Sequence, residues 1–116
     1  MENRMNQKFA VEFLPEAVEF MNSLDEKARE KIYFNIKKTQ VITDNELLKK
    51  LNADIWEFRT LYNGIAYRLF AFWDRTKKNE TLVIATHGII KKTQKTPPKE
   101  IERAENIREQ YLRNRV

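Results

Sequence analysis

The stretch Trp56-Glu57-Phe58-Arg59-Thr60-Leu61-Tyr62-Asn63-Gly64-Ile65-Ala66-Tyr67-Arg68-Leu69 decides the fold. Asn63-Gly64 between two aromatic-rich runs predicts a β-hairpin closed by a two-residue type I′ turn. With these two residues as the turn, the register of the hairpin follows. One face carries Glu57, Arg59 and Arg68. The other face carries a largely apolar set that we expect in the core: Trp56, Phe58, Thr60, Tyr62, Ile65, Tyr67, Leu69 and Ala71.

Arg59 and Arg68 are expected directly opposite each other on the two strands, with β-carbons about 5 Å apart. Like charges in this position repel, so the pair needs a negative partner. Glu57, two residues before Arg59, could bridge the arginines as a structural ion pair. Alternatively, the two guanidinium groups bind a phosphate, whose geometry suits their planar fork. We favour the phosphate site, with Glu57 holding the guanidinium groups in position.

A basic segment follows the third strand that the sequence predicts, which covers residues 80–90. The segment holds four lysines with no acidic residue between them: Lys91, Lys92, Lys95 and Lys99. Such a cluster favours an anionic polymer, most plausibly RNA, although many lysine runs are only solvated loops. His87, near the end of the strand, is either a structural hydrogen-bonding residue or a proton-transfer group.

The N-terminal half of the chain predicts a strand and two helices. Alternation over Phe9–Phe13 is typical of a strand, and Pro15 suits the start of a short helix. A capping box over Ser23–Glu26, with Ser23 as the N-cap, predicts a second helix over about Asp25–Gln40. The buried stripe expected on this second helix is Ala28, Ile32 and Ile36.

Three further expectations concern packing and connections. Phe34 and Val41 lie opposite the buried stripe, and we expect them to pack under the first helix rather than form an exposed partner-binding spot. Residues 42–53 are expected to be a solvated connector with one helical turn at most. Thr96 is placed to cap the last helix, whose first turn holds two prolines.

The order of the elements, β-α-α-β-β-β-α, predicts an α+β domain with an antiparallel sheet and the helices packed on one face. We expect residues 1–116 to form this single domain, with residues 1–6 as a flexible extension.

The composition limits the kinds of site that the chain can build. A net charge of +5 and a pI near 9.5 favour a nucleic acid or an acidic partner. The absence of cysteine excludes disulfides and thiolate metal sites, and one histidine makes a histidine-based metal site improbable, so we expect no metal and no cofactor. There is neither a transmembrane-length apolar run nor a signal region, so we expect a cytoplasmic protein with no membrane partner.

Three blocks of sequence, Trp56-Glu57-Phe58-Arg59, Ala66-Tyr67-Arg68-Leu69 and His87-Gly88…Lys91-Lys92-Thr93-Gln94-Lys95-Thr96-Pro97, resemble the phage-derived HigB-like branch of the RelE/ParE toxins. The likeness covers roughly Phe9 to Tyr111. It implies a RelE-like fold and a type II toxin. Such toxins are usually metal-independent endoribonucleases (mRNA interferases) that cut mRNA on the ribosome, and a helix-turn-helix (HigA-like) antitoxin neutralises them.

Carried over residue by residue, the resemblance points to the two arginines and to the basic residues after the third strand. The candidate catalytic residues are Arg59, Arg68, His87 and Lys91. The candidate RNA-binding residues are Lys92, Gln94, Lys95 and Lys99. Several relatives carry a tyrosine shortly after the basic run, whereas this chain has Thr93, Gln94 and Thr96 there. The resemblance therefore does not identify the general acid.

Metal-free RNA cleavage needs a base for the 2′-OH, positive groups that stabilise the phosphorane and an acid for the leaving 5′-oxygen. Arginine stays protonated and suits the second role, while His87, Lys91 or Lys92 could transfer protons. Two other functions are compatible with the same fold or the same basic face. One is a ParE-like inhibitor of DNA gyrase, and the other is a non-catalytic RNA-binding module.

Overall fold

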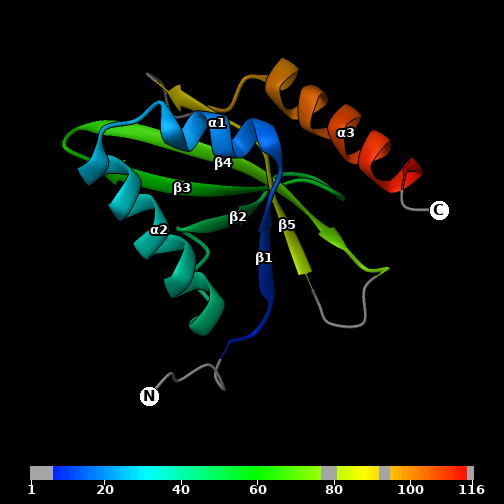
Figure 1. The fold of residues 1–116 in the computed structure, drawn as a ribbon, viewed down its shortest axis with the longest axis horizontal. Coiled ribbons are helices and arrows are strands. Elements are labelled where there is room, and N and C mark those ends of the chain that lie inside the picture. Colours follow the sequence, from blue (N-terminus) through cyan, green and yellow to red (C-terminus); the bar gives the residue numbers. More distant parts are fainter. Residues whose placement is uncertain (1–6, 77–80, 92–94, 115–116) are drawn as a thin grey trace.

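The computed structural model describes residues 7–76, 81–91 and 95–114, and of residues 81–86 only the backbone. Residues 1–6, expected to be a flexible extension, lie outside these ranges. The elements follow one another as shown in Figure 1: β1 (Ala10–Phe13), α1 (Pro15–Asn22), α2 (Glu26–Val41), β2 (Leu48–Lys50), β3 (Trp56–Tyr62), β4 (Ile65–Asp74), β5 (Thr81–Lys91) and α3 (Pro98–Arg113). Among the described residues, no helix has the length and apolarity needed to cross a membrane.

The five strands form one sheet in the order β1-β5-β4-β3-β2. Strands β2 to β5 pair with one another in antiparallel fashion, which confirms the predicted α+β class with an antiparallel sheet. Strand β1 differs, because it pairs with β5 in parallel, Ala10 lying opposite Thr81. Parallel pairing requires a long connection between the two strands, and the elements from α1 to β4 supply it.

The hairpin of β3 and β4 has the predicted register throughout. Asn63 and Gly64 have φ angles of 55° and 78°, and two positive φ values at the turn are the requirement of type I′. Arg59 lies opposite Arg68, as the turn residues predicted. The apolar face of this hairpin packs in the core under α1 and α2 as expected, except at Ile65, which lies beside the turn and is exposed.

Strand β2 corrects the prediction for residues 42–53. We expected a solvated connector with one helical turn at most, but Leu48–Lys50 pairs with β3 and forms the edge of the sheet. The strand forms because the outer edge of β3 would otherwise leave its backbone groups unpaired. The prediction missed it because a three-residue strand is too short to show a period in the sequence. Lys49 lies opposite Glu57 and therefore joins the sheet face of the arginines.

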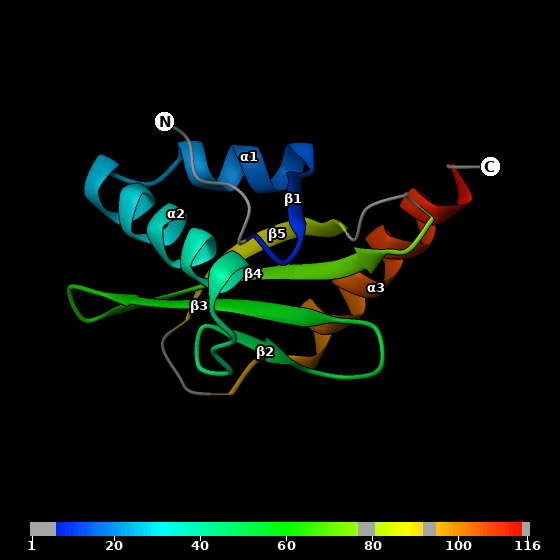
Figure 2. The same cartoon turned by 90° about the horizontal axis from the view of Figure 1, so that it is seen from below.

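The helices cover both faces of the sheet, so the prediction that they pack on one face is wrong. Helices α1 and α2 lie over the face that holds Leu69 and Ala71, whereas α3 packs through Ala104 on the face that holds Phe70 and Phe72. Figure 2 shows α1 and α2 together on one side of the sheet and the start of α3 on the other. The reason is that β4 is apolar on both faces, and each face needs cover. Below, the arginine face means the face that carries Glu57, Arg59 and Arg68, one end of which α3 covers.

The N-cap of α2 lies two residues later than the capping box implied, and the helix begins at Glu26 rather than at about Asp25. Its N-cap is Asp25, whose carboxylate accepts a hydrogen bond from the Ala28 amide at 3.0 Å. Ser23 instead closes α1, because its hydroxyl donates to the Phe20 carbonyl. The sequence offers two possible N-cap residues close together, Ser23 and Asp25, and the structure uses Asp25. The predicted buried stripe of α2 is confirmed: Ala28, Ile32 and Ile36.

Phe34 and Val41 do not pack under α1, which corrects the expectation for them. The Phe34 side chain is 60% exposed, and Val41 and Ile42 are exposed as well. The Lys31 ammonium lies over the Phe34 ring, 5.3 Å from its centroid. Helix α2 therefore presents Phe34 and Val41 to solvent among its charged side chains.

The glycine of the His87-Gly88 block has a packing role. A β-carbon at Gly88 would collide with the ring of Phe20 from α1. The bare backbone of β5 at this position therefore lets α1 approach the sheet closely.

Candidate functional site

A groove of about 840 Å³ lies at the end of the sheet near the hairpin turn. The loop before β2, both hairpin strands, the turn and the end of β5 all contribute to it. Leu61 forms an exposed apolar part of its rim. The residues that line it are Glu46, Leu47, Arg59, Thr60, Leu61, Gly64, Ile65, Ala66, Arg68, Ile90 and Lys91.

Glu57 is the buried carboxylate on which the site is built, with 1% of its surface exposed. Its Oε1 lies 3.7 Å from Nε of Arg59 and 3.6 Å from Nε of Arg68. The carboxylate therefore bridges the two arginines, as one of the two sequence interpretations proposed. One negative charge does not neutralise two guanidinium groups, however, so the bridge leaves the pair with a net positive charge.

The two arginines differ in accessibility. The side chain of Arg59 is 25% exposed, whereas that of Arg68 is 7% exposed. Burial lowers the pKa of the Arg68 guanidinium; Glu57 opposes this shift and Arg59 adds to it. Within the described residues, Nε of Arg68 has no hydrogen-bond partner, although Nη1 donates to the Tyr67 carbonyl at 3.2 Å. A buried donor without a hydrogen-bond acceptor is costly, and Oε1 of Glu57, 3.6 Å away, offsets part of this cost by charge alone.

Lys91, the last residue of β5, lies opposite Ala66 and shares the arginine face. It is buried, and its Nζ donates a hydrogen bond to Oγ1 of Thr96 at 3.1 Å. Burial lowers the pKa of this ammonium from the ordinary lysine value of 10.5; Glu57 opposes the shift, and the cations Arg68, Arg59 and Lys49 increase it. Lys91 therefore loses its proton more readily than an exposed lysine.

Thr96 has a different role from the predicted one. The N-cap of α3 is Pro97, and no side chain caps this helix. Instead, the Thr96 hydroxyl donates to Oε2 of Glu57 at 2.7 Å and accepts from Lys91. Sequence reasoning missed this contact because it joins β3 to the segment before α3, residues that are far apart in the chain.

His87 does not line the groove. It is 2% exposed, its Nε2 lies 2.9 Å from Oε1 of Glu100 in α3, and its ring stacks on Phe70 with 4.8 Å between centroids. Burial lowers the pKa of the imidazole, and the hydrogen bond to Glu100 only opposes that shift. Since substrate cannot reach a side chain under α3, we assign His87 a structural role and leave it out of the catalytic proposal.

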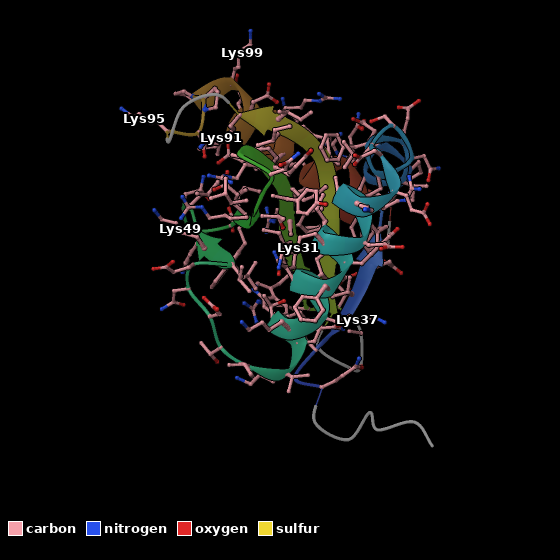
Figure 3. All side chains as sticks on the ribbon, turned by 90° about the vertical axis from the view of Figure 1, so that its left-hand side faces the viewer. Lys31, Lys37, Lys49, Lys91, Lys95 and Lys99 are labelled. Atoms are coloured by element: carbon pink, nitrogen blue, oxygen red, sulfur yellow. The ribbon has the colours of Figure 1, made fainter. Side chains whose placement is uncertain are left out.

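Four lysines surround the groove side of the molecule. Figure 3 shows Lys49, Lys91, Lys95 and Lys99 on this side, running from β2 to the start of α3, while Lys31 and Lys37 lie on α2. Lys95 and Lys99 are exposed. Lys92 and Gln94, also predicted to bind RNA, lie outside the described residues. The contribution of Lys49 was missed, because it depends on the pairing of β2.

In chemical terms, the described residues of the site offer cations without a strong nucleophile. Two guanidinium groups and the Lys91 ammonium share one buried carboxylate, which suits a ligand with concentrated negative charge such as a phosphodiester. Lys91 adds a group whose lowered pKa makes it a better proton acceptor than an exposed lysine. Among the described residues, no group of three or more histidine, aspartate or glutamate side chains is arranged to hold a metal ion.

Comparison with known families gives a match that covers most of the chain. The family model described as phage-derived protein Gp49-like (DUF891) matches residues 19–109, which span α2, the whole hairpin, β5 and most of α3. The match includes every residue of the groove. That family is toxin-like and belongs to the RelE/HigB-like toxin group. No curated protein sequence matches the chain.

Proposed function

Because the chain belongs to the phage-derived Gp49-like family, we propose that it is the toxin of a type II toxin–antitoxin system, of the HigB-like branch. The proposed activity is metal-independent cleavage of mRNA on translating ribosomes, which inhibits translation. One observation supports this most: two opposed arginines and Lys91 gather around buried Glu57 at a single groove.

In the proposed reaction, Arg59 and Arg68 bind the non-bridging oxygens of one phosphodiester in the groove. Lys91 in its neutral form takes the proton from the neighbouring 2′-OH. The 2′-oxygen then forms a bond to phosphorus, and the bond from phosphorus to the 5′-oxygen breaks. Water donates a proton to the departing 5′-oxygen, so the products carry a 2′,3′-cyclic phosphate and a 5′-OH. The arginines stabilise the additional negative charge of the phosphorane, the role that a metal ion plays in other nucleases.

The surface around the groove suits an RNA that is longer than one nucleotide. Lys95 and Lys99 are exposed beside the groove and extend its positive charge toward α3. The exposed side chain of Leu61 offers an apolar surface for a ribose or a base at the other end. We propose these residues, with Lys92 and Gln94, as RNA contacts outside the catalytic groups.

The partners proposed for this toxin are the translating ribosome with its mRNA and a helix-turn-helix antitoxin of the HigA-like kind. We propose that the ribosome holds the substrate in position for the reaction. The chain holds a single histidine, which could have been a second proton-transfer group, but the structure buries it under α3. A site with one proton-transfer group needs its substrate held in the in-line geometry by another surface. We therefore expect the isolated protein to cleave free RNA poorly, and we place the reaction in the cytoplasm.

Expression without antitoxin in bacteria tests this function against its alternatives. We expect growth to stop and total mRNA to fall, with plasmid supercoiling unchanged. The measurements are culture density, quantitative mRNA levels and the distribution of plasmid topoisomers. Growth arrest with intact mRNA and relaxed plasmids would instead identify a ParE-like gyrase inhibitor. Arrest with intact mRNA and normal supercoiling would leave a non-catalytic RNA-binding module.

Lys95 and Lys99 yield a prediction about salt dependence. Replacing both with alanine should weaken association with RNA, because RNA bound through fewer lysine–phosphate pairs releases fewer counterions. The slope of log K against log salt should fall by about 0.7 for each phosphate that is no longer neutralised. Binding of a single-stranded RNA at several salt concentrations measures this.

The matched control is the double variant Lys31→Ala, Lys37→Ala, which removes the same charge from α2. Its slope should stay near that of the parent. Equal slopes for the two double variants would show that only overall charge matters and that neither Lys95 nor Lys99 makes a phosphate contact.

A further inference from the structure

Thr96 is placed where threonine usually caps a helix, yet α3 begins at Pro98 with Pro97 as its N-cap and no side-chain cap. Its hydroxyl turns toward the sheet and contacts Glu57, the buried carboxylate of the groove site. This leaves the first amides of α3 without a side-chain cap, although such a cap ordinarily stabilises a helix. The same hydroxyl instead joins two groups of the site.

The hydrogen bonds at Thr96 have only one possible direction. A hydroxyl has a single proton, and Oε2 of Glu57, 2.7 Å away, can only accept it. The lone pairs of Oγ1 are therefore left for Lys91, whose Nζ lies 3.1 Å away. The result is a fixed chain from Glu57 through Thr96 to Lys91, which joins β3, the segment before α3 and the end of β5.

The two carboxylate oxygens of Glu57 contact different groups of the site. Oε1 lies near Nε of both arginines, and Oε2 accepts from Thr96. One buried carboxylate thus orients the phosphate-binding groups with one oxygen and, through Thr96, the proton-transfer group with the other. Loss of the hydroxyl would break the second connection and leave the first intact.

We infer that Thr96 is a positioning residue, which holds Nζ of Lys91 at the groove so that it takes the 2′-OH proton of the RNA bound by the arginines. The inference rests on the proposed function. A neutral lysine keeps two N–H groups and one lone pair. When one N–H donates to Thr96, the lone pair can turn toward the groove. Among the described residues, the charged groups that face Lys91 are Glu57 and Arg59 on β3, Arg68 on β4 and Lys49 on β2.

The first test compares single-turnover mRNA cleavage on ribosomes by four variants. Thr96→Val and Thr96→Ala lack the hydroxyl, Thr96→Ser keeps it, and Thr43→Val makes the same change at an exposed site that bonds Lys8. We expect the first two to slow the cleavage step about 10–100-fold without weakening RNA binding. Thr96→Ser and Thr43→Val should stay within about threefold of the parent. If the Thr96 hydroxyl only fixed the segment before α3, its loss would lower thermal stability or RNA affinity and leave the cleavage rate of bound RNA unchanged.

The second test does not depend on cleavage. Exchange of the Lys91 ammonium protons with water, measured by NMR at low pH in the free protein, should be about fivefold faster in Thr96→Val than in the parent and Thr96→Ser. Unchanged exchange would overturn the inference whatever the activity. Faster exchange with an unchanged cleavage rate would overturn it too. A parent that cleaves no ribosomal mRNA would contradict the proposed function instead, and the exchange rates would still decide whether Thr96 holds Lys91.

Discussion

Replacing Arg59 with alanine is expected to reduce mRNA cleavage by about 10²–10³-fold, the usual effect of removing one group that stabilises transition-state charge. Growth arrest should disappear with it. The same variant should unfold at nearly the parent temperature, because Arg68 and Glu57 remain as a balanced buried pair and the repulsion between the two arginines is removed. We expect the free energy of unfolding to change by only a few tenths of a kcal/mol. Cleavage assays and thermal melts measure the two effects.

The control for Arg59→Ala is Arg113→Ala, which removes the same charge from the exposed end of α3. It should leave cleavage unchanged. Arg59→Lys adds a second comparison, because lysine keeps the charge but loses the planar fork, and activity should fall with it. Clear destabilisation by Arg59→Ala, with toxicity retained at a permissive temperature, would show that the arginine serves the fold and binds no phosphate.

Arg68 should behave differently from Arg59, because its side chain is 7% exposed. Its removal takes a buried cation away from a buried carboxylate, and loss of activity will come with loss of stability. The sequence alone treated the two arginines alike, since the pairing across the hairpin is symmetric. Only the burial of Arg68 under the surrounding residues separates their roles.

The second large effect concerns Lys91 and pH. A general base acts when deprotonated, so the cleavage rate should rise about tenfold per pH unit below the pKa of Lys91 and level off above it. The pKa lies below the ordinary lysine value of 10.5 because burial and neighbouring cations disfavour the charged form. Lys91→Arg keeps the charge but cannot give up its proton, so it should lose the rising part of the profile.

Single-turnover rates over a range of pH test this, with Lys37→Arg on α2 as the matched control. The control should keep the pH profile of the parent. If Lys91→Arg retained both the rate and its rise with pH, Lys91 would contribute only charge and another group would take the proton.

The hairpin shows how much of this molecule its sequence determines. Asn63-Gly64 permits one tight turn, and a two-residue turn fixes which residues face each other, so the opposition of Arg59 and Arg68 could be predicted. The core positions of α2 follow in the same way from helical spacing. These features depend on neighbours in the chain or on one turn.

The features that were missed depend on contacts between distant segments. Strand β2 is too short to show a period, and Lys49 enters the site only through it. The continuous apolar run Leu69-Phe70-Ala71-Phe72 along β4 is a signal that both sheet faces need cover, and it could have placed α3 on the arginine face. The burial of His87 follows from that placement. The bond from Thr96 to Glu57 has no local signal, because Thr96 fits equally well as a helix cap.

The most direct measurement is to map the 5′ ends of mRNA on translating ribosomes after addition of purified parent protein or the Arg59→Ala variant. With the parent we expect new ends inside the reading frame that carry a 5′-OH and are ligated only after phosphorylation. With Arg59→Ala we expect these ends to be lost. Absence of new 5′-OH ends with a folded, growth-arresting parent would contradict the claim that this groove binds and cleaves RNA.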